Sequence, residues 1–235
     1  MKSEMYSKHA QQYDAAAQHN IYNAYLERPS LQALIGDING LDILDLGCGS
    51  GVYADFLIER GAKNITCLDA SESMVELVRN KLGDRVRAYT QDLTLGLPQE
   101  KSNSADVIIC PLVLHYIEDV SAIFREVERV LKPGGYLVFS THHPFADFDS
   151  SISGNYFERE LVSEVWDTIG EPVEVTFYRR SLAEWINAIA SNKLVIAELS
   201  EGQVAEEVKR ISPERYEYLS KNPNFIFFKC FKASN

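Results

Sequence analysis

The sequence predicts an α/β protein built around one mostly parallel sheet with helices on both faces. Two observations predict this fold. Between residues 41 and 139, short apolar runs typical of buried strands alternate with segments of helical periodicity. A glycine-rich turn, residues 47–51, joins the first apolar run directly to the first helical segment. The length of 235 residues, with 46% hydrophobic and 24% charged residues, suits a single domain of this kind.

The first 40 residues differ from this pattern and are expected to form two polar-to-amphipathic helices. Pro29 suits the first turn of the second helix, where an amide hydrogen is not needed. We expect this N-terminal helical cap, residues 1–40, to pack over the carboxyl edge of the sheet. It lacks the apolar stretch of a secretory signal. His9 and His19 lie on its polar stretches and are expected to face solvent.

Helical segments separate five strand-like runs in the central region. These runs are Ile43–Leu46, Ile65–Leu68, Val86–Tyr89, Val107–Cys110 and Tyr136–Ser140. The helix after the second run is predicted to begin with a capping box formed by Ser73 and Glu76. The helix before the fifth run is predicted to stop at the Lys-Pro-Gly-Gly turn of residues 132–135.

The alternation of strands and helices ends after Ser140. Residues 142–180 are predicted to form an inserted loop and hairpin over the carboxyl edge of the sheet, where an active site is expected. Residues 142–158 have a loop composition, and two β-like runs, Leu161–Asp167 and Val173–Tyr178, form the predicted hairpin. Four further elements complete the chain: a helix capped by Ser181, a strand over Leu194–Leu199, a short helix begun by Ser212 and Pro213, and a strand over Phe225–Phe231.

Composition excludes several classes of function. The formal charge is 23 − 34 = −11, which makes nucleic acid an unfavourable partner because phosphate backbones are repelled. No pair among the four cysteines has zinc-ligand spacing, so buried reduced thiols and no metal site are expected. The longest apolar run, Val107–Leu114, is too short to span a bilayer. The sequence therefore predicts a soluble, cytoplasmic protein.

The glycine turn is the most informative segment. Glycines at alternate positions permit a positive φ and allow a ligand to approach the backbone. The spacing is Gly-x-Gly-x-Gly, and Val52 stands where a dinucleotide fingerprint needs its third glycine. The phosphate-loop motif fails because no Gly-Lys-Ser/Thr follows. The alternative is that the glycines serve only a tight strand-to-helix turn.

An acid at the end of the second strand supports ligand binding at this turn. Asp69 is placed to accept hydrogen bonds from both hydroxyls of a ribose. The alternative is that Asp69 caps the next helix, a role that Ser71 or Ser73 could share. The combination of turn and acid favours a nucleoside ligand.

Four segments in order carry a resemblance to a known family: LDLGCGSG, LDASESMVELVRNK, YTQDLTLGLP and VLKPGGYLVFS. The sequence resembles the class I S-adenosylmethionine-dependent methyltransferases, in particular their small-molecule branch, strongly over residues 40–142 and loosely elsewhere. The resemblance implies one Rossmann-like doubly wound domain over residues 1–235. It implies seven strands with the last antiparallel, which Phe225–Phe231 would supply.

The resemblance also implies roles in binding S-adenosyl-L-methionine. Asp45 would reach the amino group of its methionine portion, directly or through water, and Asp69 would hold the ribose hydroxyls. Tyr13 matches a Tyr-Asp pair that closes over the cofactor, and the backbone near Cys110 would face the methionine end. Residues of the glycine turn would line the methionine and ribose portions: Gly47, Cys48, Gly49 and Gly51. Residues further along the chain would lie near the adenine: Ala70, Met74, Asp92 and Leu93.

Transfer of a sulfonium methyl group is an in-line displacement that needs alignment and exclusion of water. A general base helps when the acceptor is a hydroxyl or a protonated amine. His115 follows the fourth strand run, and His142 and His143 follow the fifth, so all three are candidate catalytic bases. The alternative is that they only shape the pocket. Aromatic residues in the inserted segment indicate a lid that selects the acceptor.

The sequence leaves competing functions open. Many enzymes that methylate bases carry an Asn/Asp-Pro-Pro-aromatic tetrad after the fourth strand, whereas this chain has Cys-Pro-Leu-Val at residues 110–113. A small-molecule acceptor is therefore expected. A protein or RNA methyltransferase, a nicotinamide-dependent oxidoreductase and a non-catalytic cofactor-binding protein remain alternatives. The acceptor, the use of a general base and the oligomeric state are not specified by the sequence.

Overall fold

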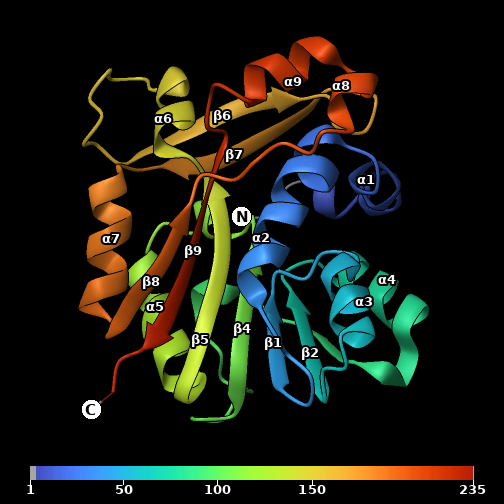
Figure 1. The fold of residues 1–235 in the computed structure, drawn as a ribbon, viewed down its shortest axis with the longest axis vertical. Helices are drawn as coiled ribbons and strands as arrows, with labels where there is room; N and C mark the ends of the chain where they lie inside the picture. Colours follow the sequence, from blue (N-terminus) through green and yellow to red (C-terminus); the bar gives the residue numbers. More distant parts are fainter. Residues whose placement is uncertain (1–3, 235) are drawn as a thin grey trace.

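The computed structural model describes residues 4–234 and contains a seven-stranded sheet covered by helices on both faces (Figure 1). The strand order is β3-β2-β1-β4-β5-β9-β8. The strands are β1 (Asp42–Leu46), β2 (Asn64–Asp69), β3 (Arg87–Thr90), β4 (Ala105–Pro111), β5 (Leu131–His142), β8 (Leu194–Ser200) and β9 (Phe225–Lys232). The first five run parallel, and β9 is antiparallel to both of its neighbours, β5 and β8. The predicted Rossmann-like sheet with an antiparallel last strand is confirmed.

Two hydrophobic cores lie on opposite faces of the sheet. Side chains alternate along a strand, so Ile43 of β1 joins one core while its neighbour Leu44 joins the other. The main helices of the core that holds Ile43 are α2 (Arg28–Ile35), α3 (Val52–Glu59) and α4 (Glu72–Leu82). The main helices of the core that holds Leu44 are α5 (Val120–Val130) and α7 (Leu182–Ser191). The predicted helices α4, α5 and α7 are therefore present, each with its apolar face on the sheet.

Short helices complete the described chain. They are η1 (Glu4–Tyr6), α1 (Ala10–Ala17), the π-helical turn η2 (Asn23–Glu27), η3 (Gly83–Arg85), η4 (Leu93–Leu95), η5 (Leu114–Tyr116), α6 (Pro144–Asp147), η6 (Phe148–Ser150), α8 (Val208–Ile211) and α9 (Pro213–Leu219). None of the helices within residues 4–234 combines the length and the apolar character that crossing a bilayer needs.

One of the two predicted helix caps is wrong and the other is confirmed. Helix α4 is capped by Ser71, whose hydroxyl accepts a hydrogen bond from the Met74 amide, and Ser73 lies inside the first turn. The shift arises because β2 ends at Asp69 and Ser71 is the residue with extended backbone. The cap predicted at Ser181 is confirmed by its hydrogen bond from the Glu184 amide, at 3.2 Å.

The helix predicted to stop at the Lys-Pro-Gly-Gly turn does end there. Helix α5 ends at Val130 and β5 begins at Leu131, so the turn itself lies in the first residues of the strand. A Cβ at Gly135 would lie only 2.8 Å from the carbonyl oxygen of Asp106, so glycine permits this close approach to β4.

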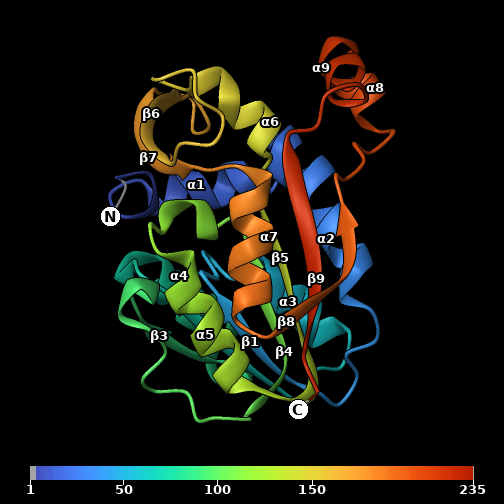
Figure 2. The ribbon, with the colours of Figure 1, turned by 90° about the vertical axis from the view of Figure 1, so that its left-hand side faces the viewer.

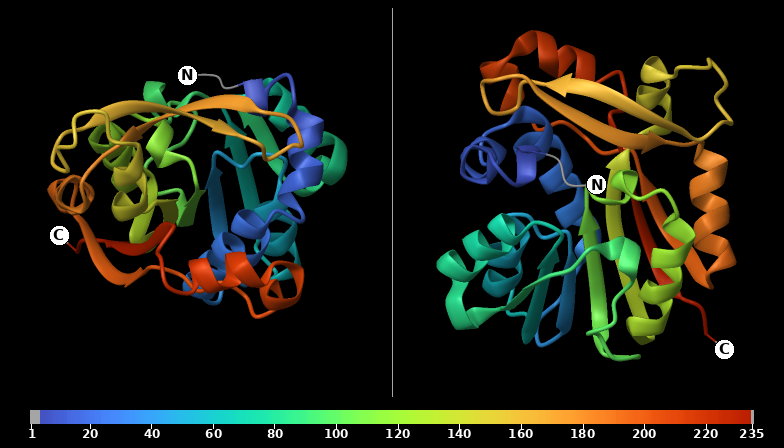
Figure 3. Two further views of the ribbon diagram at one scale, coloured as in Figure 1. Left: turned by 90° about the horizontal axis from the view of Figure 1, so that it is seen from above. Right: turned by 180° about the vertical axis from the view of Figure 1, so that it is seen from behind.

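A second, two-stranded sheet lies above the carboxyl edge of the main sheet (Figures 2 and 3). It is an antiparallel hairpin of β6 (Glu160–Trp166) and β7 (Val173–Arg179), as the sequence predicted. The preceding segment is not all loop, because β5 extends to His142 and the helices α6 and η6 follow. Met5 of η1 packs in a small cluster with Val173 and Val175 of β7, which joins the N-terminal helices to the hairpin.

The solvent exposure predicted for the two N-terminal histidines is half correct. His19 is exposed, but only 13% of the His9 side chain is exposed. His9 Nδ1 lies 3.1 Å from a carboxylate oxygen of Glu171, in the turn of the hairpin. His9 therefore contacts the inserted segment, a tertiary contact that the polar pattern of its helix did not reveal.

Candidate active site

A cavity of about 870 Å³ lies at the carboxyl edge of the sheet, between the main sheet, the N-terminal helices and the hairpin. Strand order reverses between β1 and β4, and such a switch point is where open α/β sheets bind ligands. The predicted site residues that line the cavity are Tyr13, Gly47, Cys48, Gly49, Asp69, Ala70, Asp92, Leu93, His115 and His142. The predicted residues that do not line it are Asp45, Gly51, Met74, Cys110 and His143.

The three glycines of the turn have different roles. All three adopt positive φ values, of 70° at Gly47, 52° at Gly49 and 87° at Gly51. A Cβ at Gly47 would lie 2.2 Å from the side chain of Val113, whereas one at Gly49 would meet nothing within 4 Å. A Cβ at Gly51 would press on Val78 of α4, at 3.2 Å. Gly51 thus serves helix packing, and Gly49 leaves its backbone open to a ligand.

Asp69 fixes the shape of the turn. Its carboxylate accepts hydrogen bonds from the amide of Gly49 at 3.0 Å and from the amide of Ser71 at 2.8 Å. Burial raises the pKa of this carboxyl even though backbone amides stabilise its charged form. The residue lines the cavity while it connects the glycine turn to the start of α4. The structure is therefore compatible with both roles weighed for Asp69.

Asp45 presents an unsatisfied pair of acceptors beneath the turn. The side chain is fully buried, and neither carboxylate oxygen has a hydrogen-bond partner in the part of the chain that the structure describes. Burial, with Asp69 and Glu27 as further causes, raises its pKa well above the ordinary value. Buried acceptors of this kind need a donor. An ammonium group of a bound cofactor would supply one.

The remaining predicted cofactor residues divide between the cavity wall and the core. Asp92 caps η4 by accepting hydrogen bonds from the amide and the hydroxyl of Thr94, at 2.9 and 2.7 Å. Leu93 and Ala70 line the cavity beside it. Met74 and Cys110 are fully buried, and burial raises the pKa of the Cys110 thiol. A polar contact at Cys110 would therefore come from its backbone, as the resemblance implies.

Two of the three candidate bases lie together in the cavity wall. The imidazole rings of His142, the last residue of β5, and His115 of η5 stack with centroids 3.9 Å apart and planes 16° apart. His142 Nδ1 lies 3.2 Å from a carboxylate oxygen of Asp147. His115 is 1% exposed, and burial together with nearby His142 lowers its pKa well below the ordinary value. His115 is therefore a neutral ring against which His142 packs.

His143 is held away from the cavity. Its Nδ1 accepts a hydrogen bond from the Phe145 amide at 3.1 Å and so caps α6. Its Nε2 lies 3.0 Å from a carboxylate oxygen of Glu201. Burial lowers the pKa of this imidazole. Because neighbouring residues in extended backbone point in opposite directions, His142 and His143 cannot both face the same space.

Sequence reasoning missed two tyrosines that line the cavity. The hydroxyls of Tyr6 and Tyr116 are 2.7 Å apart, which connects η1 to η5 across the cavity wall. The ring of Tyr6 also meets that of Tyr13 edge to face, at 4.9 Å. Burial is the main cause that raises the pKa of all three. Tyr6 lies in the same YSKHAQQYD segment as Tyr13, and this proximity could have indicated it.

Glu27 is a third residue that the sequence did not indicate. It ends the π-helical turn η2, is 3% exposed and lines the cavity. Its carboxylate accepts hydrogen bonds from the Tyr53 hydroxyl at 3.0 and 3.1 Å and from the Ser140 hydroxyl at 2.6 Å. Burial raises its pKa to about 7. A lone glutamate in a helical segment carries no sequence signal of this environment.

Comparison with known proteins finds methyltransferases, the class of enzyme that the sequence resembles. Residues 44–139 match a family described as a methyltransferase domain. A demethylmenaquinone methyltransferase from Lactococcus lactis is 33% identical over 142 residues, which are 58% of this chain and 56% of that protein. The alignment thus spans about half the length of that relative.

Solved structures match over nearly the whole chain. An S-adenosylmethionine-dependent methyltransferase from Mesorhizobium loti is 27% identical with a TM-score of 0.71, over 93% of this chain and 99% of that one. A structure from Listeria monocytogenes, described as a methyltransferase of the same cofactor class, is 26% identical with a TM-score of 0.74, over 87% and 95%. With the glycine turn, the buried Asp45 and the cavity at the switch point, these likenesses show a methyltransferase domain over residues 44–139 and the fold of S-adenosylmethionine-dependent methyltransferases.

Proposed function

We propose that this enzyme methylates a small-molecule acceptor and that His142 acts as the general base. The observation that carries the proposal is the arrangement of His142, Asp147 and His115 in the wall of the cavity. The relative from Lactococcus lactis supports it, because a demethylmenaquinone methyltransferase acts on a small molecule. The acidic net charge of −11 disfavours nucleic acid as the acceptor.

The proposed cofactor residues bind and orient rather than react. Asp69 holds the ribose hydroxyls, Asp45 accepts from the methionine amino group through water, and the backbone of Gly47 and Gly49 lies along the cofactor. Asp92 lies near the adenine. S-adenosyl-L-methionine, when bound, supplies a methyl group that its sulfonium already activates for in-line displacement. The protein therefore needs to align the acceptor and exclude water.

Asp147 orients the proposed base. If Nδ1–H of His142 donates to the Asp147 carboxylate, the imidazole is in the tautomer that leaves Nε2 free to accept a proton. The stack on His115 restricts rotation of the ring, as does the edge-to-face contact with Phe177 at 4.7 Å. His142 Nε2 would take the proton of an acceptor hydroxyl or amine as the new bond to the methyl carbon forms.

The inserted segment, residues 142–180, supplies fewer aromatic side chains to the cavity than its composition indicates. Trp166 lines the cavity, and its indole N–H donates to Glu164 at 2.8 Å. Phe145 and Phe157, in contrast, are 63% and 76% exposed, and neither lines the cavity. The proposed selection of the acceptor by the inserted segment, residues 142–180, therefore rests on Trp166 and its polar neighbours.

A methyl-transfer screen tests the proposal. Wild-type protein and labelled S-adenosyl-L-methionine would be incubated with libraries of small phenols, amines, thiols and carboxylates, and in parallel with bulk RNA and protein. We expect label in one small-molecule class. With that acceptor, His142→Gln should lower kcat by about 10²- to 10⁴-fold, the usual contribution of a general base. Exposed His19→Gln is the control and should not change kcat. Label in RNA or protein alone would contradict the proposal.

A further inference from the structure

Glu27 connects η2 to α3 and β5 at the cavity, and no ion pair within the described residues neutralises its charge. Its carboxylate accepts hydrogen bonds from Tyr53 of α3 and Ser140 of β5. The Ser140 hydroxyl in turn accepts from the amide of Leu112, at 3.0 Å. Leu112 has a φ of 51°, a strained value for a residue with a branched side chain, and follows β4 directly. The π-helical turn that carries Glu27 is itself a form found frequently at functional sites.

The charges that face Glu27 leave an excess of acid in this part of the site. The charge of Glu27 raises the pKa of Asp45 of β1, of Tyr13 of α1 and of Tyr53 of α3. Within residues 4–234, Arg28 is the cation that lowers the pKa of Glu27, and it is the smallest of the causes. Its guanidinium donates instead to the carbonyl oxygen of Ala17, at 2.8 Å. Among the described residues, none forms an ion pair with either carboxylate.

This environment fits a ligand that brings a compact cation with several donors. A primary ammonium group has three N–H donors and no acceptor, which matches two buried carboxylates with vacant lone pairs. A hydroxyl could satisfy one acceptor but would not balance the charge. A guanidinium needs a planar, bidentate partner, and the hydrogen bonds from Tyr53 and Ser140 already occupy part of Glu27.

We propose that Glu27, which lines the cavity, binds the α-ammonium group at the amino-acid end of the cofactor. Asp45 is buried outside the cavity lining and reaches the same group through water. Asp69 is bound on both oxygens by backbone amides at the end of β2, on the other side of the glycine turn. Glu27 lies instead beside the ends of β4 and β5, through Leu112 and Ser140. The two acids thus hold opposite ends of one ligand. This division does not depend on which acceptor is methylated.

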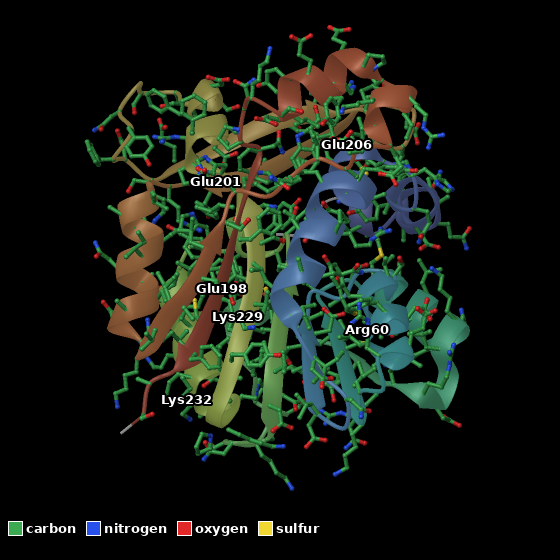
Figure 4. All side chains as sticks on the ribbon, viewed as in Figure 1. Arg60, Glu198, Glu201, Glu206, Lys229 and Lys232 are labelled. Carbon is green, nitrogen blue, oxygen red and sulfur yellow. The ribbon has the colours of Figure 1, made fainter. Side chains whose placement is uncertain are left out.

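Binding of two ligands that differ only at the amino-acid end tests this proposal. S-adenosylhomocysteine carries the α-ammonium group, whereas 5′-methylthioadenosine keeps the nucleoside and thioether but lacks the amino-acid portion. Their Kd values would be measured by calorimetry at pH 8 with wild type, Glu27→Gln and Glu198→Gln. The control residue Glu198 is 56% exposed and lies near Lys229 on β8 and β9, outside the cavity (Figure 4).

We expect Glu27→Gln to weaken S-adenosylhomocysteine by about tenfold or more, because a charge-assisted hydrogen bond is lost. Its Kd for 5′-methylthioadenosine should stay within about twofold of the wild type, and Glu198→Gln should change neither. Equal weakening of both ligands would show that Glu27 only shapes the cavity and would overturn the proposal, as would unchanged affinity for both.

A second measurement needs no variant. In the wild type, the affinity for S-adenosylhomocysteine relative to 5′-methylthioadenosine should fall from pH 8 to pH 6, because protonated Glu27 cannot attract an ammonium group. A ratio that stays constant over this range would overturn the proposal. The acceptor screen remains a separate test of the proposed function, because these titrations contain no acceptor.

Discussion

For two acidic residues at the carboxyl edge, Glu27 and Asp45, burial has a larger effect on the carboxyl pKa than any ion pair or hydrogen bond. Glu27 and Asp45 are 3% and 0% exposed, and burial is the first cause that raises the pKa of both. A carboxyl with a raised pKa costs stability when it ionises, because the charged form is removed from water. The apoprotein therefore holds this site at an energetic cost, and a cationic ligand would offset it.

The pH dependence of stability tests this cost at Glu27. Its folded-state pKa of about 7 lies above the ordinary 4.5, so the folded protein binds the proton more tightly. The stabilisation by that proton is present in full below pH 4.5 and is lost as the pH rises towards 7. We expect urea unfolding to show that Glu27→Gln becomes more stable relative to wild type by about 3 kcal/mol between pH 4.5 and pH 7.5. A difference that does not change with pH would contradict this assignment.

Some residues of the candidate site could be predicted from the sequence and others could not. Asp69 and Gly49 follow a strand and belong to a motif, so their place in the cavity follows from chain order. Glu27 and Asp147 are brought to the cavity only by tertiary packing, and no local pattern marks either one. His143 shows the opposite error, because adjacency to His142 in sequence gave no information on which side chain faces the cavity.

At the scale of elements, one buried cation connects the hairpin to the loop that carries His115. Arg180 follows β7, is 1% exposed, and donates through its guanidinium to the carbonyl oxygens of Leu114, Ile117 and Glu118, at 3.3, 2.6 and 3.2 Å. These carbonyls follow or belong to η5, and helix ends leave carbonyls that need donors from outside the helix. The residue that follows the hairpin therefore holds the segment that carries His115 in place through these hydrogen bonds. The alternating strands of the hairpin were predictable, but this connection was not.

Removal of the Arg180 guanidinium should destabilise the protein. We expect Arg180→Met to lower the free energy of unfolding by about 2–4 kcal/mol, because three carbonyls, two of them in buried hydrogen bonds, lose a charged donor. Arg79→Met is the matched control, because this side chain is 48% exposed and its ion pair with Glu72, which is 55% exposed, lies at the surface. The control should cost less than about 1 kcal/mol. Equal losses for the two variants in urea denaturation would rule out a special role for Arg180.

At the scale of the whole molecule, the cavity is closed by two segments that are far apart in sequence. The N-terminal helices and the hairpin meet over the carboxyl edge, where Met5 packs on Val173 and Val175 (Figure 3). This cluster has three buried members, whereas each main core combines strands of the central sheet with the helices that cover it. Contacts within the sheet follow from the periodicity of the sequence, but the meeting of these two segments depends on long-range packing that periodicity does not encode.

The small size of this cluster predicts that the closure opens more readily than the sheet. Local opening is easiest where few apolar contacts must be broken, and a ligand that fills the cavity favours the closed form. We expect S-adenosylhomocysteine to slow amide hydrogen exchange by about tenfold or more in residues 4–17 and 160–179. Exchange in β8, which lies outside the cavity, is the control and should not change. Met5→Ser should speed exchange of both closing segments in the free protein, since it removes the apolar contact between them. Slowing in β8 equal to that in the closing segments would indicate global stabilisation instead of closure.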